Sequence, residues 1–251
     1  GNLPELSLQG WGSVFSGVNR TEGNLPIAGT NFKIGKVSGF GVDVDDLKVE
    51  AEKRGEGFGV QLSSDKLNGV VDWQPYDEGK LSVKLKNFSW GGIGAMSEES
   101  GESEPMSPGN LPSLQVSIED MVMKGQSIGR FDLVGHPEGQ DWKLRRLNIT
   151  NPDGSLSGDG IWRSDEGKMQ TELNLQLSII DAGKTLARSG YPDTVKGGSG
   201  KLSANLSWPG PPNKYSNENL SGSLTLDTGK GRFLQMEPGA GKLLSILSLQ
   251  A

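Results

Sequence analysis

Hydrophobic and polar residues alternate along most of this chain with a period of two. The clearest stretch runs from Glu172 to Ile179, where three leucines and the isoleucine are separated by polar residues. The same alternation occurs in residues 58–62, 81–86, 114–119 and 220–226. Because successive side chains of a strand point to opposite faces of the sheet, this pattern predicts strands with one apolar and one polar face.

The alternation changes phase at two places. One lies between Val44 and Leu47, and the other lies between Leu144 and Leu147. An extra residue or a sharp bend shifts the faces of a strand in this way. We therefore expect a β-bulge or a bend at each of these positions.

Helix signals are confined to two short stretches. Residues 181–190 predict a helix with Asp181 as its N-cap and Gly190 just past its end, because Pro192 prevents its continuation. Residues 241–249 form the second candidate, with a broad apolar stripe of leucine and isoleucine. The predicted fold is therefore all-β, with one or two short helices.

Composition narrows the possible functions. The chain has 251 residues, 38 glycines, 33% hydrophobic residues and a formal net charge of −6. The glycines suit the many turns of a β protein, and the negative charge argues against a nucleic-acid partner, which needs basic residues against phosphates. No cysteine is present, so disulfides and thiolate metal sites are excluded. No apolar run is long enough for a membrane-spanning helix.

An internal repeat organises the sequence. Residues 1–6 recur at 109–114, residues 67–73 match 156–162, and residues 79–83 match 167–171. The repeat predicts a first β unit at 1–96 and a second at 110–200, separated by an acidic flexible loop at 97–109. A partial third unit at 201–251 would end in the terminal amphipathic helix. Stacking such units extends one sheet.

Four motifs resemble parts of known phosphate, nucleotide or metal sites, but none has the residues and spacing that such a site needs. Gly183-Lys184-Thr185 lacks the first glycine of a phosphate-binding loop, and residues 55–59 suit a hairpin better than a dinucleotide site. His136, the only histidine, is placed in a turn and has no cysteine to share a metal with. Asp43, Asp45 and Asp46 lack the spacing of a calcium loop and suit a solvated strand face. We expect no catalytic residue, no metal and no cofactor.

The apolar strand face has to be covered, because exposed apolar surface is unfavourable in water. Two short helices are too few to cover so many strands. A second sheet, closure into a barrel, or a groove filled by an apolar ligand would each solve the problem. Length and repeat favour an elongated sheet, but the alternation by itself leaves ordinary packing and ligand binding open.

The C-terminal part of the chain resembles a known family. Residues 220–250 (LSGSLTLDTGKGRFLQMEPGAGKLLSILSLQ) are similar to the C-terminal signature of the YhdP family of AsmA-like proteins. Residues 151–162 resemble the strand-turn-strand motif that this family repeats, and Ser189-Gly190-Tyr191-Pro192 is similar to the end of its short helix. The resemblance is strong from about Asn110 onward and weaker before it.

The resemblance implies a non-enzymatic function. Members of this family and the related TamB proteins are bridge-like lipid-transfer proteins, anchored in the inner membrane of Gram-negative bacteria and extending through the periplasm. Their elongated, curved antiparallel sheet, a repeating β-groove, is thought to shield phospholipid acyl chains on the way to the outer membrane. The present chain would be a C-terminal fragment, whose link to the membrane lies in other parts of the full-length protein and which could also meet protein partners in the envelope.

We accordingly expect the alternating apolar residues to line a lipid groove. The candidates are Leu81, Val83, Leu85, Val116, Ile118, Leu173, Leu175, Leu177, Leu224 and Leu226. One alternative is a structural or protein-binding β-repeat module without lipid. Another is a carbohydrate-active enzyme, which would need a pair of carboxylates facing a cleft.

Overall fold

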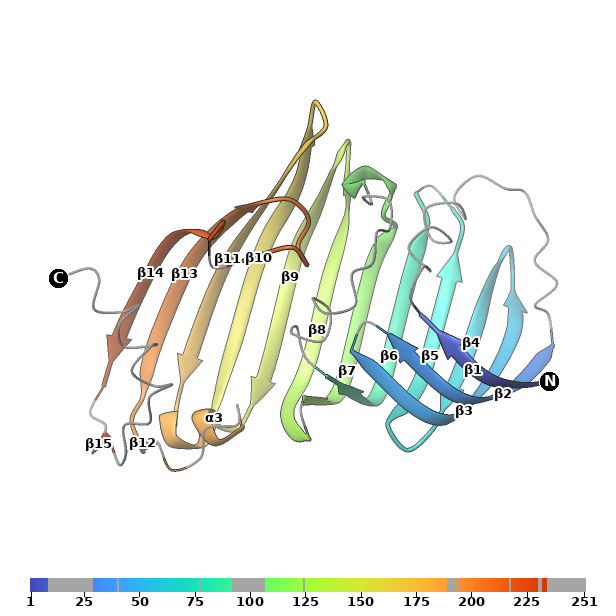
Figure 1. The fold of residues 1–251 in the computed structure, drawn as a ribbon, viewed down its shortest axis with the longest axis horizontal. Helices are drawn as coiled ribbons and strands as arrows, with labels where there is room; N and C mark the ends of the chain where they lie inside the picture. The colour runs from blue at the N-terminus through green and yellow to red at the C-terminus, as the bar shows by residue number, and fades with distance from the viewer. Residues whose placement is uncertain are drawn as a thin grey trace.

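The chain forms one long, curved and unclosed β-sheet in a computed structural model (Figure 1). The structure describes residues 1–8, 29–39, 41–76, 78–91, 107–123, 125–188, 193, 195–216, 218–229 and 232–233. Thirteen strands pair in the order β1-β2-β3-β4-β5-β6-β7-β8-β9-β10-β11-β13-β14, so spatial order follows chain order. The predicted elongated all-β architecture is confirmed.

The strands of the first half are β1 (Asn2–Ser7), β2 (Thr30–Gly39), β3 (Val42–Arg54), β4 (Gly57–Ser63), β5 (Leu67–Gln74) and β6 (Lys80–Trp90). The second half continues with β7 (Ser113–Met123), β8 (Gln126–Glu138), β9 (Asp141–Asn151), β10 (Gly154–Asp165), β11 (Lys168–Ile179), β13 (Gly200–Pro209) and β14 (Ser221–Thr228). A separate small sheet pairs β12 (Val195–Lys196) with β15 (Arg232–Phe233).

Two of the strand pairs are parallel, which the sequence pattern did not predict. These pairs are β1 with β2 and β6 with β7, and the other neighbours in the long sheet are antiparallel. Parallel neighbours cannot be joined by a tight hairpin and need a longer crossover. The long connections from Ser7 to Thr30 and from Trp90 to Ser113 meet this requirement.

Both predicted phase changes are confirmed, by two different devices. In β9 the pairing register shifts between Leu144 and Leu147 against both neighbouring strands, which is a β-bulge. Between Val44 and Leu47 the register with β2 is unchanged. The backbone bends there instead, because Asp46 has a φ of 52°, in the left-handed region that L-residues rarely adopt.

The first predicted helix is also confirmed. Helix α3 spans Ala182–Arg188, and the Lys184 backbone N–H donates to Asp181 Oδ1 at 3.1 Å, so Asp181 is the N-cap. The second predicted helix, at 241–249, Gly190 and the acidic stretch from 97 to 106 lie outside the described residues. Pro108, at the end of the predicted flexible loop, is fully buried in a 3-10 turn, η2 (Pro108–Asn110).

One core cluster is formed where the sheet curls most strongly. Its residues come from β2, β3, β5, β6 and β7 and belong to one face of the sheet. They are Ile34, Val37, Val44, Leu47, Leu67, Leu85, Ile118 and Met121, called the buried cluster below. Because these strands contact one another through this face, the apolar face is the concave one.

Candidate apolar groove

All ten predicted groove residues lie on the same face of the long sheet. Residues directly opposite each other on paired strands share a face, so the pairing register decides this. Val83 pairs with Val116 across β6 and β7, and Leu175 of β11 pairs through Ala204 of β13 with Leu224 of β14. The other candidates follow the same rule at positions two residues away along each strand.

These residues belong to three apolar rows that cross the strands. The middle row is Val60, Val71, Val83, Val116, Leu133, Leu147, Gly158, Leu175, Ala204 and Leu224. On one side of it run Leu81, Leu114, Gly135, Leu144, Gly160, Leu173, Leu206 and Gly222. On the other side run Leu85, Ile118, Phe131, Ile149, Leu156, Leu177, Leu202 and Leu226. From β8 to β14, no position in the three rows carries a charge.

Several residues of the rows were missed from the sequence. Leu133 and Leu147 connect the two predicted groups of the middle row into one continuous strip. The bulge in β9 hid Leu147, because it breaks the simple alternation of that strand. Phe131 and Leu133 could have been found, since they alternate with the charged residues Arg130 and Asp132 along β8.

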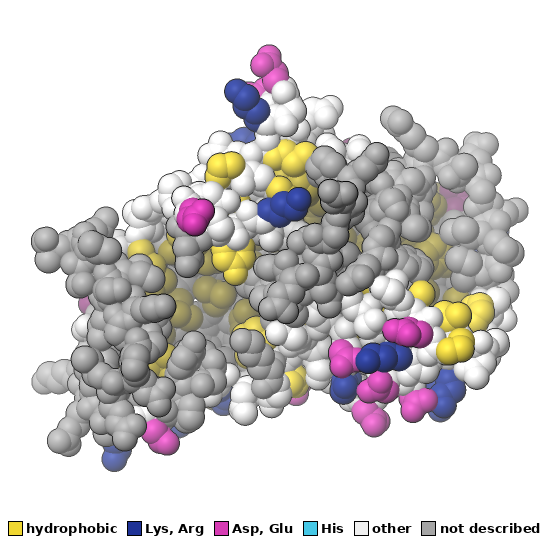
Figure 2. Space-filling model, viewed as in Figure 1, with side chains coloured by type: hydrophobic (Ala, Val, Ile, Leu, Met, Phe, Trp, Pro, Cys, Tyr) yellow, Lys and Arg dark blue, Asp and Glu magenta, His cyan; other side chains and the backbone are white. Residues whose placement is uncertain are grey.

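The large side chains of the three rows are partly exposed from β8 to β14. Leu173, Leu175 and Leu177 are all of intermediate exposure, and Leu226 is 38% exposed. Figure 2, viewed from the same side as Figure 1, shows hydrophobic side chains inside a hollow in the part where β9 to β14 lie. The concave face of this half is therefore an apolar groove that runs across the strands.

The convex face carries the charged side chains. Arg130 Nε donates to Asp132 at 2.8 Å, Arg54 bonds Asp72 at 2.6 Å, and Arg163 pairs with Glu172 across β10 and β11. The hydrogen bond from Arg130 lowers the pKa of Asp132 below its ordinary value. This segregation leaves polar groups in water and apolar groups on the concave side.

Three tryptophans stand at one edge of the groove. The register places Trp142, Trp162, Thr171 and Trp208 in one row at the ends of β9, β10, β11 and β13. All four are buried, which agrees with packing rather than with a row of exposed sugar-binding aromatics. The indole N–H groups of Trp142 and Trp208 donate to the Pro112 and Pro211 carbonyls, each at 3.1 Å. The Trp162 N–H is buried and has no hydrogen-bond partner within the described part of the chain.

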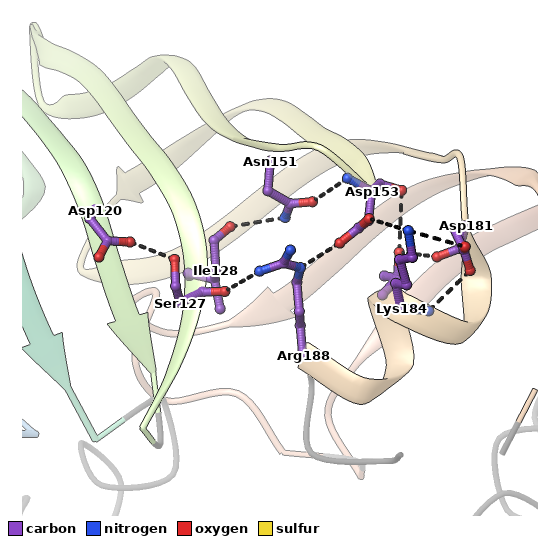
Figure 3. Close-up of polar contacts among 9 residues, drawn as sticks. Asp120, Ser127, Ile128, Asn151, Asp153, Asp181, Lys184 and Arg188 are labelled. Carbon is purple, nitrogen blue, oxygen red and sulfur yellow. Dashed lines mark hydrogen bonds and ion pairs between the residues drawn. The ribbon is translucent and has the colours of Figure 1, made fainter. Parts of the chain in front are cut away.

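The opposite edge is fastened by side chains that we call the polar brace: Asp120, Ser127, Asn151, Asp153, Lys184 and Arg188 (Figure 3). Arg188 Nε, on α3, donates to buried Asp153 at 2.6 Å, and its Nη1 donates to the Ser127 carbonyl at 3.1 Å. Asn151 links the Asp153 N–H to the Ile128 carbonyl of β8. The brace thus ties α3 to the ends of β8, β9 and β10, beside the groove.

The motifs that lacked chemical support are ordinary parts of the sheet. Residues 55–59 form the β3–β4 hairpin, and Asp43, Asp45 and Asp46 are exposed and pair with lysines. His136 lies within β8 opposite Lys143, so its placement in a turn was wrong; the turn follows Glu138. Strand β8 continues through Gly135-His136-Pro137, where the glycine and the proline had suggested a turn.

In the described part of the chain, no group of histidine, cysteine, aspartate or glutamate has an arrangement that could hold a metal ion. Among the same residues, no helix has the length and hydrophobicity needed to cross a membrane.

Comparison with known proteins gives one result. No curated protein and no solved structure matched the chain. The family model described as YhdP protein matches residues 1–251, the whole sequence. The chain, with its unclosed curved sheet and continuous apolar rows, therefore belongs to the YhdP family.

Proposed function

We propose that this chain is a segment of a periplasmic, bridge-like protein that shields phospholipid acyl chains in its concave groove as they pass between the inner and outer membranes. The observation that carries the proposal is the unbroken middle row, flanked by two more apolar rows, on a face that stays partly exposed from β8 to β14. Apolar surface of this extent on a concave face is typical of a ligand groove.

The physical basis is transfer of the acyl chain out of water. Each methylene group buried against the rows contributes about 0.8 kcal/mol, so a long chain is held without any specific polar ligand. The contacts repeat from strand to strand with similar leucine, isoleucine and valine side chains. A chain that leaves one set of contacts therefore gains an equivalent set at the next strand, which favours sliding along the groove.

Membership of the YhdP family supports the cellular setting. In this proposal the chain works in the envelope, is linked to the inner membrane through other parts of the full-length protein, and carries out no chemical reaction. Its ligand is phospholipid. Protein partners in the envelope would meet the convex face or the ends of the sheet.

The proposal is tested by placing a charge on the middle row. Leu175→Asp puts a carboxylate among the apolar rows of β11, and Gln176→Asp puts the same group on the exposed convex face of the same strand. We expect Leu175→Asp to abolish recovery of co-purified phospholipid while the protein stays folded by circular dichroism. Gln176→Asp is expected to retain lipid.

Two results would contradict the proposal. One is equal lipid recovery from folded Leu175→Asp, Gln176→Asp and unchanged protein. The other is an absence of phospholipid from all three, which would favour a protein-binding β-repeat module without lipid.

A further inference from the structure

The apolar face is not uniform along the sheet. In β2 to β7 part of this face forms the buried cluster, in which Val44 is 0% and Ile118 is 3% exposed, whereas Val83 and Val116 are of intermediate exposure. Val83 and Val116 of the middle row pack against this cluster. From β8 to β14 the large side chains in the row of Leu85 and Ile118 are partly exposed, and Leu226 is 38% exposed. The groove therefore has a self-filled section and an open section.

The self-filled section arises because the sheet curls onto itself. The β4–β5 hairpin is short, and beyond its turn the longer strands β3 and β6 come together. The Gly91 N–H donates to the Gly41 carbonyl at 2.7 Å, and Lys66 Nζ donates to the Asp43 carbonyl at 3.1 Å. The curl is visible at the N-terminal end of Figure 1, where β2 and β3 return in front of the sheet.

A pair of repeat-related positions shows the difference between Leu85, in a side row, and Leu175, in the middle row. Gly69 faces Leu85 in β5 and β6, and Gly158 faces Leu175 in β10 and β11. In each pair the leucine covers the glycine, because a Cβ on the glycine would lie 2.8 Å or 2.7 Å from the leucine Cδ2. Leu85 is only 7% exposed, whereas Leu175 is partly exposed. The same local motif is thus buried in one section and accessible in the other.

We propose that acyl chains are held in the open section, β8 to β14, and that the buried cluster removes the row of Leu85 and Ile118 from the groove at β6 and β7. This inference rests on the proposed function and locates its binding site. The six strands of the open section span about 24 Å at a strand spacing of about 4.8 Å. That length exceeds the roughly 15 Å that the acyl chains of one membrane leaflet span, so the open section holds a whole lipid tail.

The buried cluster resists entry for an energetic reason. An acyl chain that entered the buried cluster would have to separate side chains that already contact one another, and it would gain no new burial for them. In the open section the same contact removes exposed leucine surface from water. We therefore assign Leu85 and Ile118, which were predicted as groove residues, to the buried cluster.

Single cysteines test this division, because the chain contains no cysteine of its own. The open-section variants are Leu175→Cys and Leu224→Cys, and the matched cluster variants are Leu85→Cys and Ile118→Cys. Each 251-residue variant is checked for folding by circular dichroism and then alkylated with N-ethylmaleimide. Alkylation is measured for lipid-free protein and after incubation with vesicles of phosphatidylethanolamine and phosphatidylglycerol.

We expect Leu175→Cys and Leu224→Cys to react readily and to be protected by lipid. Leu85→Cys and Ile118→Cys should react slowly in both conditions, and either one suffices if the other does not fold. Lipid-dependent protection of a reactive thiol at position 85 or 118 would overturn the division while leaving lipid binding intact. An absence of protection at position 175 and at position 224 would overturn both this inference and the proposed function.

Discussion

Trp162 provides a sharp test of the packing at the groove edge. Among the residues that the structure describes, its buried indole N–H finds no hydrogen-bond partner, and the residue is 4% exposed. Its cross-strand neighbour Trp142 is 8% exposed, and its N–H donates to the Pro112 carbonyl at 3.1 Å. Replacing each tryptophan by phenylalanine removes the same ring atoms and the same N–H group. The two variants therefore differ mainly in the hydrogen bond.

The magnitude follows from the cost of an unpaired buried polar group, which is about 1–3 kcal/mol. Trp142→Phe loses the hydrogen bond and leaves the Pro112 carbonyl unpaired, so it pays this cost in addition to the cavity. Trp162→Phe removes a donor that is already unpaired, so it relieves a similar cost and offsets its cavity. We expect Trp142→Phe to be less stable than Trp162→Phe by about 2 kcal/mol or more.

The assay is urea unfolding followed by circular dichroism, with the midpoints and slopes of the two variants compared. Equal slopes would show that both variants unfold the same structure, so that a change of midpoint reports stability. The reasoning is refuted if Trp162→Phe lowers the free energy of unfolding as much as Trp142→Phe does.

Three further predictions concern the brace, the convex face and the groove floor. Arg188→Ala leaves the buried Asp153 carboxylate without its closest cation and should lower the free energy of unfolding by about 2–3 kcal/mol in urea unfolding. Adding Asp153→Asn to this variant should restore part of the loss. An unchanged midpoint in Arg188→Ala would contradict this prediction. The pKa of Asp132 lies below 3.8 because Arg130 bonds it, so its small stabilising contribution is present above about pH 4 and is lost as pH falls through the lowered value. Carboxyl NMR titration should show this pKa rising in Arg130→Gln, and no rise would argue against the pairing. Gly158→Ala should lower the free energy of unfolding by about 1–3 kcal/mol, because the new Cβ would lie 2.8 Å from a backbone oxygen of β11. An unchanged free energy of unfolding would mean that β10 and β11 can move apart at this position without cost.

The strands and their apolar faces could be predicted from the sequence because alternation is a local signal. All ten candidate residues fall on one face, since each was chosen from a period-two run whose phase is fixed within its own strand. The helix at α3 was also predictable, because Asp181 carries a local capping signal. The resemblance to the family was carried by residues 220–250. The order of the residues in this stretch is specific to the family, whereas the alternation of apolar and polar residues is not.

Features that depend on distant pairing could not be predicted in this way. The parallel pairing of β6 with β7 depends on how the chain crosses the sheet, which no local pattern encodes. The difference between Leu85 and Leu175 arises from the curl that brings β3 to β6, and both residues read alike in the sequence. Arg188 bonds Asp153 and Ser127, which lie 35 and 61 residues away in the chain. The polar brace therefore could not be predicted from the sequence.

The most direct test of the central claim is native mass spectrometry of the purified 251-residue chain after incubation with phosphatidylethanolamine and phosphatidylglycerol vesicles. The account predicts a population whose mass exceeds that of the protein by one phospholipid and which is lost in Leu175→Asp but kept in Gln176→Asp. A spectrum that contains only lipid-free protein in all three, with the fold intact, would contradict the claim that the concave face is a lipid groove.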